Sequence, residues 1–326
     1  MNNQQIIIYN ENDIIESAFE YFRKKGFPYP DLPIHICMQE INKLANTPMD
    51  KLIRTNTAYD VADTYHKHRF ECHAINMKSP LEAFQDDKTL KKTLYLTYKY
   101  NKSIPDGKLG KLSIINGTQA CSNFRPGFAC YIYKTYCKPH DIVLDTSTGF
   151  GGRLIGFIAS NINGKYIGID PCKKTHLANI KMATDLKFID KVELYNSAVE
   201  DLDEKLLYEK CDFAFTSPPY FCKEYYSDED NQSHNRYKTF DEWINGFLKP
   251  MIKFQYNSLK NNSFNIINIA DVKIKNKIYS LKDITISLAS EIGFQFIKEE
   301  IFPLQNRMGV NTDSISVEPI LIFKKY

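Results

Sequence analysis

Five short apolar segments, each running into a polar or glycine-rich turn, constrain the fold of this chain more than any other feature. They are DIVLD (141–145), KYIGID (165–170), KVELYNS (191–197), CDFAFTS (211–217) and FNIINIAD (264–271). The stretches between them repeat apolar residues at helical spacing, as in GRLIGFIAS (152–160) and the long FDEWINGFLKPMIKFQYNSL (240–259). Strands that alternate with helices in this way predict an α/β fold with a parallel sheet wound in right-handed crossovers.

The two ends of the chain depart from this alternation of strands and helices. After a helix that ends at Gly293, the segments QFIKEEIF (295–302) and EPILIFKK (318–325) have the pattern of two strands with no helix between them. Such a pair must be antiparallel or nearly so, which predicts an antiparallel C-terminal hairpin. The N-terminal part is mostly helical, beginning with IIESAFEYFRKKG (14–26), which stops at Gly26. We therefore expect a helical region over 1–116 and an α/β domain over 117–326.

Composition excludes several classes of protein. With 43% hydrophobic and 25% charged residues among 326, the chain is globular rather than disordered. No apolar run approaches the roughly 20 residues of a membrane helix, and the N-terminus lacks the pattern of a signal peptide. A cytoplasmic protein with no membrane partner is expected. The eight cysteines form no CxxC pair, so we expect free thiols, Cys222 among them as a buried one, and no metal site.

A glycine-rich turn follows the first strand. The segment runs from Asp145 through Thr-Ser-Thr to Gly149, Phe150 and Gly151, and a helix then begins. Glycine lets a ligand approach the backbone closely, and the helix start carries unpaired N–H groups. Asp170 ends the second strand, where a carboxylate binds ribose hydroxyls in doubly wound sheets. Because a GK[ST] sequence and a full GxGxxG fingerprint are both missing, the turn favours a nucleoside ligand without a pyrophosphate.

The fourth strand runs into Ser217-Pro218-Pro219-Tyr220. The two prolines fix the backbone and remove two N–H donors, so this loop presents carbonyl acceptors beside a hydroxyl and an aromatic ring. Acceptors of this kind suit a planar group with an exocyclic amine, on which Tyr220 can stack.

The order of glycine-rich turn, acidic strand end and Ser-Pro-Pro-Tyr resembles the amino-methylating DNA methyltransferases, which modify N4 of cytosine or N6 of adenine. The resemblance covers about 121–326. It implies the class I S-adenosylmethionine-dependent methyltransferase (Rossmann-like) fold, a seven-stranded sheet with an antiparallel last hairpin. It also implies S-adenosylmethionine as cofactor, double-stranded DNA as partner, and a target base flipped out of the duplex.

The resemblance assigns the site residues by position. Ser217, Pro218, Pro219 and Tyr220 match the catalytic loop, in which the Ser217 oxygen and the Pro218 carbonyl would hold the amine. The cofactor-binding residues it implies are Phe124, in the Ser-Asn-Phe-Arg-Pro-Gly segment from 122 to 127, together with Asp145, Gly149, Gly151, Asp170 and Ser197. Ser, rather than Asp or Asn, before the prolines favours N4 of cytosine within this family.

The chain departs from the family at two places. Thr146-Ser147 replaces an aromatic or Pro-Phe pair after the strand Asp, and Asn196-Ser197-Ala198 stands where an acid often contacts the adenine of the cofactor. Asp201 is a candidate substitute for that acid.

Substrate recognition is expected in the helical 1–116 region and in the polar segment 223–242, which follows the catalytic loop. Seven lysines, interleaved with tyrosines, suggest a phosphate-contacting strip: Lys88, Lys91, Lys92, Lys99, Lys102, Lys108 and Lys111. A solvated helix face is the equal alternative. Four other functions remain open: N6-adenine methylation, methylation of an RNA or protein amine, a non-catalytic DNA-binding regulator with this fold, and a nucleotide-binding dehydrogenase.

Overall fold

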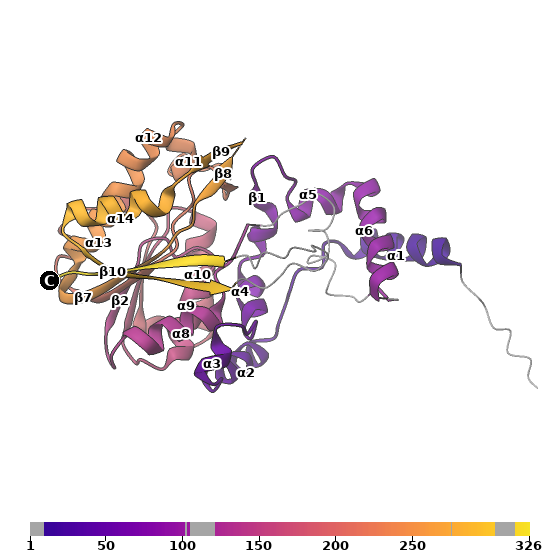
Figure 1. The fold of residues 1–326 in the computed structure, drawn as a ribbon. Helices are drawn as coiled ribbons and strands as arrows, with labels where there is room; N and C mark the ends of the chain where they lie inside the picture. Colours follow the sequence, from indigo (N-terminus) through magenta and orange to yellow (C-terminus); the bar gives the residue numbers. More distant parts are fainter. Residues whose placement is uncertain (1–9, 102, 105–120, 275, 304–316) are drawn as a thin grey trace, which may run out of the picture. The chain divides into compact units, whose positions relative to one another are not determined.

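The computed structural model (Figure 1) describes residues 10–101, 103–104, 121–274, 276–303 and 317–326. Contacts divide the chain into two units, one of residues 1–30 with 67–121 and one of residues 31–66 with 122–326. This division differs from the boundary expected at residue 116. Residues 31–66 belong with the sheet because their helices bury Cys37, Leu44 and Val61 in the same core as the helices that flank it.

The first unit is helical in its described part. It contains α1 (Glu11–Lys25), η1 (Lys67–Glu71), the short β1 (His73–Ala74), α5 (Pro80–Gln85) and α6 (Asp87–Asn101). The predicted end of the first helix at Gly26 is confirmed. Its core is a small apolar cluster of Ile15, Phe22, Phe84, Leu90 and Leu94.

The second unit is built on a seven-stranded sheet with the order β10-β11-β7-β5-β2-β3-β4. The strands are β2 (Ile142–Asp145), β3 (Lys165–Ile169), β4 (Val192–Tyr195), β5 (Cys211–Thr216), β7 (Leu259–Asn268), β10 (Gln295–Pro303) and β11 (Val317–Lys324). The first five run parallel, and β11 lies antiparallel to both of its neighbours, β7 and β10. The expected α/β fold, a parallel sheet with an antiparallel C-terminal hairpin, is confirmed.

Helices cover both faces of this sheet (Figure 1). One face carries α8 (Pro126–Tyr136), α9 (Gly152–Ser160) and α10 (Lys173–Asp185), backed by α2 (Ile34–Ala45), α3 (Met49–Leu52) and α4 (Tyr59–Tyr65). The other face carries α13 (Lys249–Ser258) and α14 (Leu281–Ile292), each of which packs on strands of the sheet. In the described parts of the chain, no helix has both the length and the apolar character needed to cross a membrane.

The connection from β5 to β7 differs from the single long helix expected over 240–259. It contains β6 (Glu224–Tyr225), α11 (Ser233–Arg236), α12 (Phe240–Trp243) and a π-helical turn, η5 (Ile244–Leu248), before α13. Pro250 explains the interruption, because a proline has no N–H for the helical bond and its ring crowds the preceding turn. A hairpin of β8 (Val272–Ile274) and β9 (Lys277–Tyr279) follows β7 and was not expected.

Candidate active site

The predicted site residues meet at one edge of the sheet. The turn 146–151 follows β2, Asp170 follows β3, Ser197 lies just beyond β4, and the loop 217–220 follows β5. Because these four strands are parallel, their carboxyl ends share that edge. The chain leaves β2 for β3 and β4 on one side and returns to β5 on the other. The glycine-rich turn and the Ser-Pro-Pro-Tyr loop therefore flank the switch point at which ligands bind in doubly wound sheets.

Asp145 organises the turn from inside the protein. Its carboxylate is fully buried and accepts hydrogen bonds from Arg153 Nε (2.8 Å) and Nη2 (3.2 Å), the Tyr166 hydroxyl (2.6 Å), Thr216 Oγ1 (3.0 Å) and the Ser147 N–H (3.2 Å). Burial and this neighbouring carboxylate hold the pKa of Tyr166 well above its usual value. Both oxygens of Asp145 are engaged by protein donors, so this side chain fixes the turn rather than facing a ligand.

The turn and Asp170 are joined directly. Gly149 and Gly151 adopt left-handed backbone angles, with φ of 58° and 75°, which favour glycine. The Gly149 N–H donates to Asp170 Oδ2 (2.8 Å), and the Cys172 N–H donates to Oδ1 (3.0 Å). Desolvation raises the pKa of Asp170 to about 6, against the lowering effect of these two N–H groups. Each oxygen of this partly exposed carboxylate keeps a further lone pair, which suits adjacent hydroxyl groups.

Phe124 is held close to the start of α9. A Cβ on Gly152 would lie 1.8 Å from the Phe124 carbonyl oxygen, so only glycine permits this approach. The Phe124 ring packs on Phe128 (5.5 Å between centroids) and Phe215 (5.3 Å), and the Arg153 guanidinium lies 5.4 Å from its centroid. Phe124 therefore contacts both Gly152, which follows the glycine-rich turn, and the strand that leads into the Ser-Pro-Pro-Tyr loop.

The segment after β4 is tied to the end of β3. Asn196 Nδ2 donates to the carbonyl oxygens of Asp170 (3.1 Å) and Pro171 (2.9 Å). The Ser197 hydroxyl donates to the Ala198 carbonyl (2.9 Å). Ser197 thus directly follows the residue that is bonded to the end of β3, and its oxygen keeps acceptor capacity.

Asp201, the candidate substitute for the acid of the adenine contact, has Arg236 as its partner in the structure. Its two oxygens accept from Arg236 Nη1 (2.7 Å) and Nη2 (2.6 Å), which lowers its pKa. Glu200 accepts from the Tyr237 hydroxyl (3.2 Å), and burial raises its pKa. These bonds anchor the polar 223–242 segment beyond the end of β4 and leave Asp201 engaged.

The Ser-Pro-Pro-Tyr loop is hydrogen-bonded to Asn268, a residue that the sequence patterns did not identify. Thr216 pairs with Ile267 in the parallel register of β5 and β7, which sets Ser217 beside Asn268 at the strand ends. The Ser217 hydroxyl donates to Asn268 Oδ1 (3.0 Å), and the Tyr220 hydroxyl lies 3.2 Å from the same oxygen. Asn268 is 1% exposed. The signal available in the sequence was a pair of asparagines, Asn265 and Asn268, among the apolar residues of the strand segment 264–269.

The exit from the loop is fixed by aromatic packing. Phe221 has a φ of 54°, rare for a residue with a side chain. Its buried ring contacts Phe240 (5.4 Å between centroids), Trp243 (6.0 Å) and Tyr279 of β9 (5.5 Å). This contact set holds a left-handed conformation that costs about 1 kcal/mol or more.

None of the eight cysteines, all of which the structure describes, is part of a disulfide. Cys222, expected to be buried, is partly exposed beside the loop. Lys223 follows, with its Nζ 5.3 Å from the centroid of the Tyr220 ring. Across the described residues, no group of three or more His, Cys, Asp or Glu side chains is arranged to hold a metal ion.

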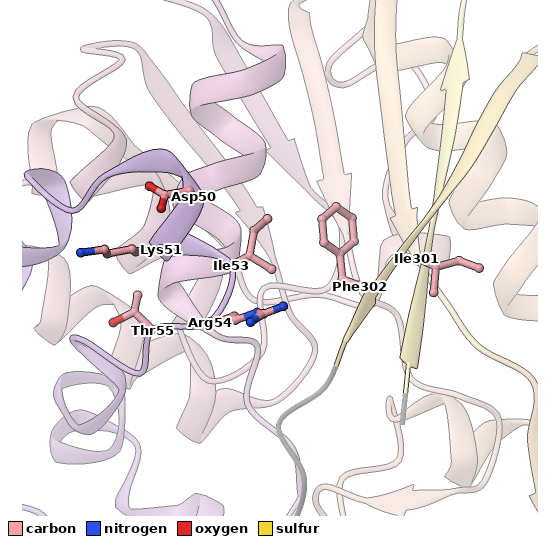
Figure 2. Close-up of a pocket in the computed structure, with 7 residues that line it drawn as sticks. All are labelled: Asp50, Lys51, Ile53, Arg54, Thr55, Ile301 and Phe302. Atoms are coloured by element: carbon pink, nitrogen blue, oxygen red, sulfur yellow. The ribbon is translucent and has the colours of Figure 1, made fainter. Parts of the chain in front are cut away.

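Two cavities flank the end of β10, outside the cluster described above. Figure 2 shows the larger, an open groove of about 700 Å³ lined by Asp50, Lys51, Ile53, Arg54, Thr55, Ile301 and Phe302. The second, of about 330 Å³, is lined by Ala270, Asp271, Lys282, Glu299, Ile301 and Pro319. None of the predicted site residues lines either cavity.

The predicted lysine strip is only partly described. Lys88, Lys91, Lys92 and Lys99 belong to α6, whereas Lys102, Lys108 and Lys111 lie outside the described residues. Lys91 pairs with Glu16 (2.7 Å). Lys88, Lys92 and Lys99 are exposed on a helix whose other face is buried, which is compatible with either interpretation of the strip.

No protein-family model matches the chain, and no curated protein is significantly similar to it in sequence. Among solved structures, TrmN from Thermus thermophilus is 14% identical, covering 62% of this chain and 49% of its own, with a TM-score of 0.42. The chain thus spans about half the length of that protein.

Two other solved structures are similarly distant. The 1,6-didemethyltoxoflavin-N1-methyltransferase of Burkholderia thailandensis, solved with 1,6-didemethyltoxoflavin and S-adenosylhomocysteine bound, is 14% identical, covering 60% of this chain and 76% of its own, with a TM-score of 0.41. A SAM-dependent O-methyltransferase from Thermotoga maritima is 13% identical, covering 65% of this chain and 70% of its own, with a TM-score of 0.40. The strand order and the antiparallel β11 themselves define the fold of this chain, which is class I methyltransferase-like.

Proposed function

We propose that the protein is an S-adenosylmethionine-dependent methyltransferase acting on the exocyclic amine of a flipped base in double-stranded DNA, with N4 of cytosine preferred. The observation that carries this proposal is the position of the Ser217–Tyr220 loop. It lies at the carboxyl end of β5, directly across the switch point from the glycine-rich turn.

The residues around the turn fit the cofactor. Phe124, Gly149, Gly151, Asp170 and Ser197 would hold it, with Asp170 accepting from the ribose hydroxyls through its remaining lone pairs. We assign Asp145 as a positioning residue, because its oxygens are engaged by Arg153, Tyr166 and Thr216. When bound, S-adenosylmethionine supplies an electrophilic methyl group on a sulfonium.

The loop would activate the amine by accepting hydrogen bonds from its N–H groups. The nitrogen lone pair of a base amine is delocalised into the ring, so the amine is a poor nucleophile. Hydrogen bonds from its N–H groups to the Ser217 oxygen and the Pro218 carbonyl would favour a pyramidal nitrogen, with the lone pair directed at the methyl group.

The transfer balances without a covalent enzyme intermediate. The new N–C bond forms as the C–S bond breaks, S-adenosylhomocysteine leaves, and the nitrogen loses a proton to water. Tyr220 would stack on the extruded base and keep the amine in line with the methyl group.

To test the proposal, the purified protein is incubated with labelled S-adenosylmethionine and unmodified duplex DNA, and the nucleosides released from the DNA are identified by mass spectrometry. N4-methylcytosine is expected, and N6-methyladenine would keep the mechanism while reversing the base preference. Methylation of RNA or protein alone would refute the assignment of DNA as the substrate. A protein that does not bind the cofactor would refute the proposal that it is a methyltransferase.

Ser217→Ala should lower kcat by about 10- to 100-fold, which is the effect of one well-placed hydrogen bond to a developing charge. If that variant kept the full wild-type kcat, the proposed role of Ser217 as an acceptor for the amine would be wrong.

A further inference from the structure

The orientation of the Asn268 side-chain amide is fixed by its surroundings. Its Nδ2 lies 3.1 Å from the main-chain carbonyl oxygen of Pro319 in β11. A carbonyl oxygen can only accept a hydrogen bond, so the nitrogen must face Pro319 and Oδ1 must face the Ser-Pro-Pro-Tyr loop.

This orientation also fixes the hydroxyl protons of the loop. Oδ1 carries no proton, so the Ser217 hydroxyl (3.0 Å) must donate to it. The Tyr220 hydroxyl lies 3.2 Å from Oδ1 and 3.3 Å from the main-chain oxygen of Asn268, and both of these atoms are acceptors. Both hydroxyl protons are therefore directed at Asn268, and the Ser217 oxygen keeps only lone pairs for a ligand.

We propose that Asn268 is a positioning residue that makes the Ser217–Tyr220 loop an acceptor-only surface, which admits an amine and excludes a carbonyl in its place. The inference rests on the proposed function and explains how the site would select an amine over a carbonyl. Pro218 and Pro219 reinforce it, because neither has an N–H that could donate to a carbonyl. If a base carried a carbonyl oxygen in place of the amine, the lone pairs of that oxygen would face the lone pairs of the loop oxygens. Such a base should bind much more weakly, because the buried acceptors of the loop would have no donor.

Two substitutions separate this role from simple structural support. Asn268→Leu fills a similar volume but releases both hydroxyl protons, which can then donate to a substrate. Asn268→Asp keeps the acceptor, but its ionised carboxylate would face the Pro319 carbonyl. Only the protonated form of that variant donates to Pro319 while still accepting from the hydroxyls, as the amide does.

The measurements use a duplex that the wild-type protein methylates and a matched duplex in which a carbonyl replaces the target amine. For Asn268→Leu we expect kcat to fall about 10- to 100-fold and the binding preference for the amine duplex to fall by a similar factor. For Asn268→Asp, the ratio of its kcat to that of wild type should rise as the pH falls. Ser217→Ala combined with Asn268→Leu should lose less than the sum of the two single changes, because both remove the acceptor role of the Ser217 hydroxyl.

Asn265→Asp is the matched control, since Asn265 is fully buried in the same strand but donates to Gln255 (3.0 Å). It should lower stability without changing the amine preference. An Asn268→Leu variant that folds and keeps both its kcat and its amine preference would overturn the inference, as would a flat pH ratio for Asn268→Asp. A wild-type protein that methylates no amine at all would instead remove the proposed function, and this inference with it.

Discussion

Replacing Arg153 by Met should destabilise the protein strongly, because it leaves the buried Asp145 carboxylate without its counter-charge. The Arg153 side chain is 4% exposed and that of Asp145 is 0% exposed. Arg153 supplies two hydrogen bonds to Asp145, of 2.8 and 3.2 Å, and a third to the Ser147 carbonyl. The donors left to the carboxylate are Tyr166, Thr216 and the Ser147 N–H.

The expected loss follows from two independent estimates. Breaking a buried ion pair by removing one partner costs about 3–5 kcal/mol. Two hydrogen bonds to a charged group, at about 1.5–3 kcal/mol each, give a similar sum. A domain has only about 5–15 kcal/mol of stability in total, so the variant should unfold at a much lower denaturant concentration.

Urea unfolding of Arg153→Met and of the wild-type protein tests this reasoning, because the midpoint and slope of each transition give the free energy of unfolding.

Lys249→Met is the matched control, because the Lys249–Glu291 pair has exposed fractions of 40% and 60%. An ion pair as exposed as this one contributes about 1 kcal/mol or less. A loss of under about 1 kcal/mol in Arg153→Met would refute the account of this cluster.

Three further substitutions test other parts of the fold and site. Gly152→Ala places a Cβ 1.8 Å from the Phe124 carbonyl and should lower the free energy of unfolding by about 1–3 kcal/mol, despite alanine's better helix propensity; equal or higher stability in urea would contradict the close approach. Because the pKa of Asp170 is about 6, S-adenosylmethionine should bind about tenfold more weakly at pH 5 than at pH 7.5 by calorimetry, and Asp170→Asn should abolish that pH dependence. Phe221→Ala should cost about 3–5 kcal/mol of stability in chemical denaturation by opening its aromatic cluster; a loss below 1 kcal/mol would show that the cluster collapses around the gap.

The strands were predictable from sequence because each is a short apolar run bounded by a turn, and burial on both faces of a parallel sheet requires that pattern. The antiparallel hairpin followed from the absence of a helix between the last two strands. The interruption at η5 was missed because the apolar spacing of 240–259 continues through Pro250, and only the geometry shows where the helix widens.

The candidate site was predictable where it depends on local sequence. Gly149, Asp170 and Ser217 each lie in the segment that follows a strand, and parallel pairing brings the ends of these strands together. Asn268 was not predictable as their partner, since its role depends on pairing between β5 and β7 and on Pro319 of β11. The buried position of Asp145 likewise depends on Arg153, Tyr166 and Thr216, which one sequence pattern does not connect.

The position of β11 has a consequence for the order in which this protein can fold during synthesis. β11 lies inside the sheet, between β7 and β10, although it follows both in the chain. While residues 317–326 are still within the ribosome, β7 has an unpaired edge and the amide of Asn268 lacks its Pro319 acceptor. The nascent chain can therefore form its parallel strands first, but the loop from Ser217 to Tyr220 gains its final support about 100 residues later.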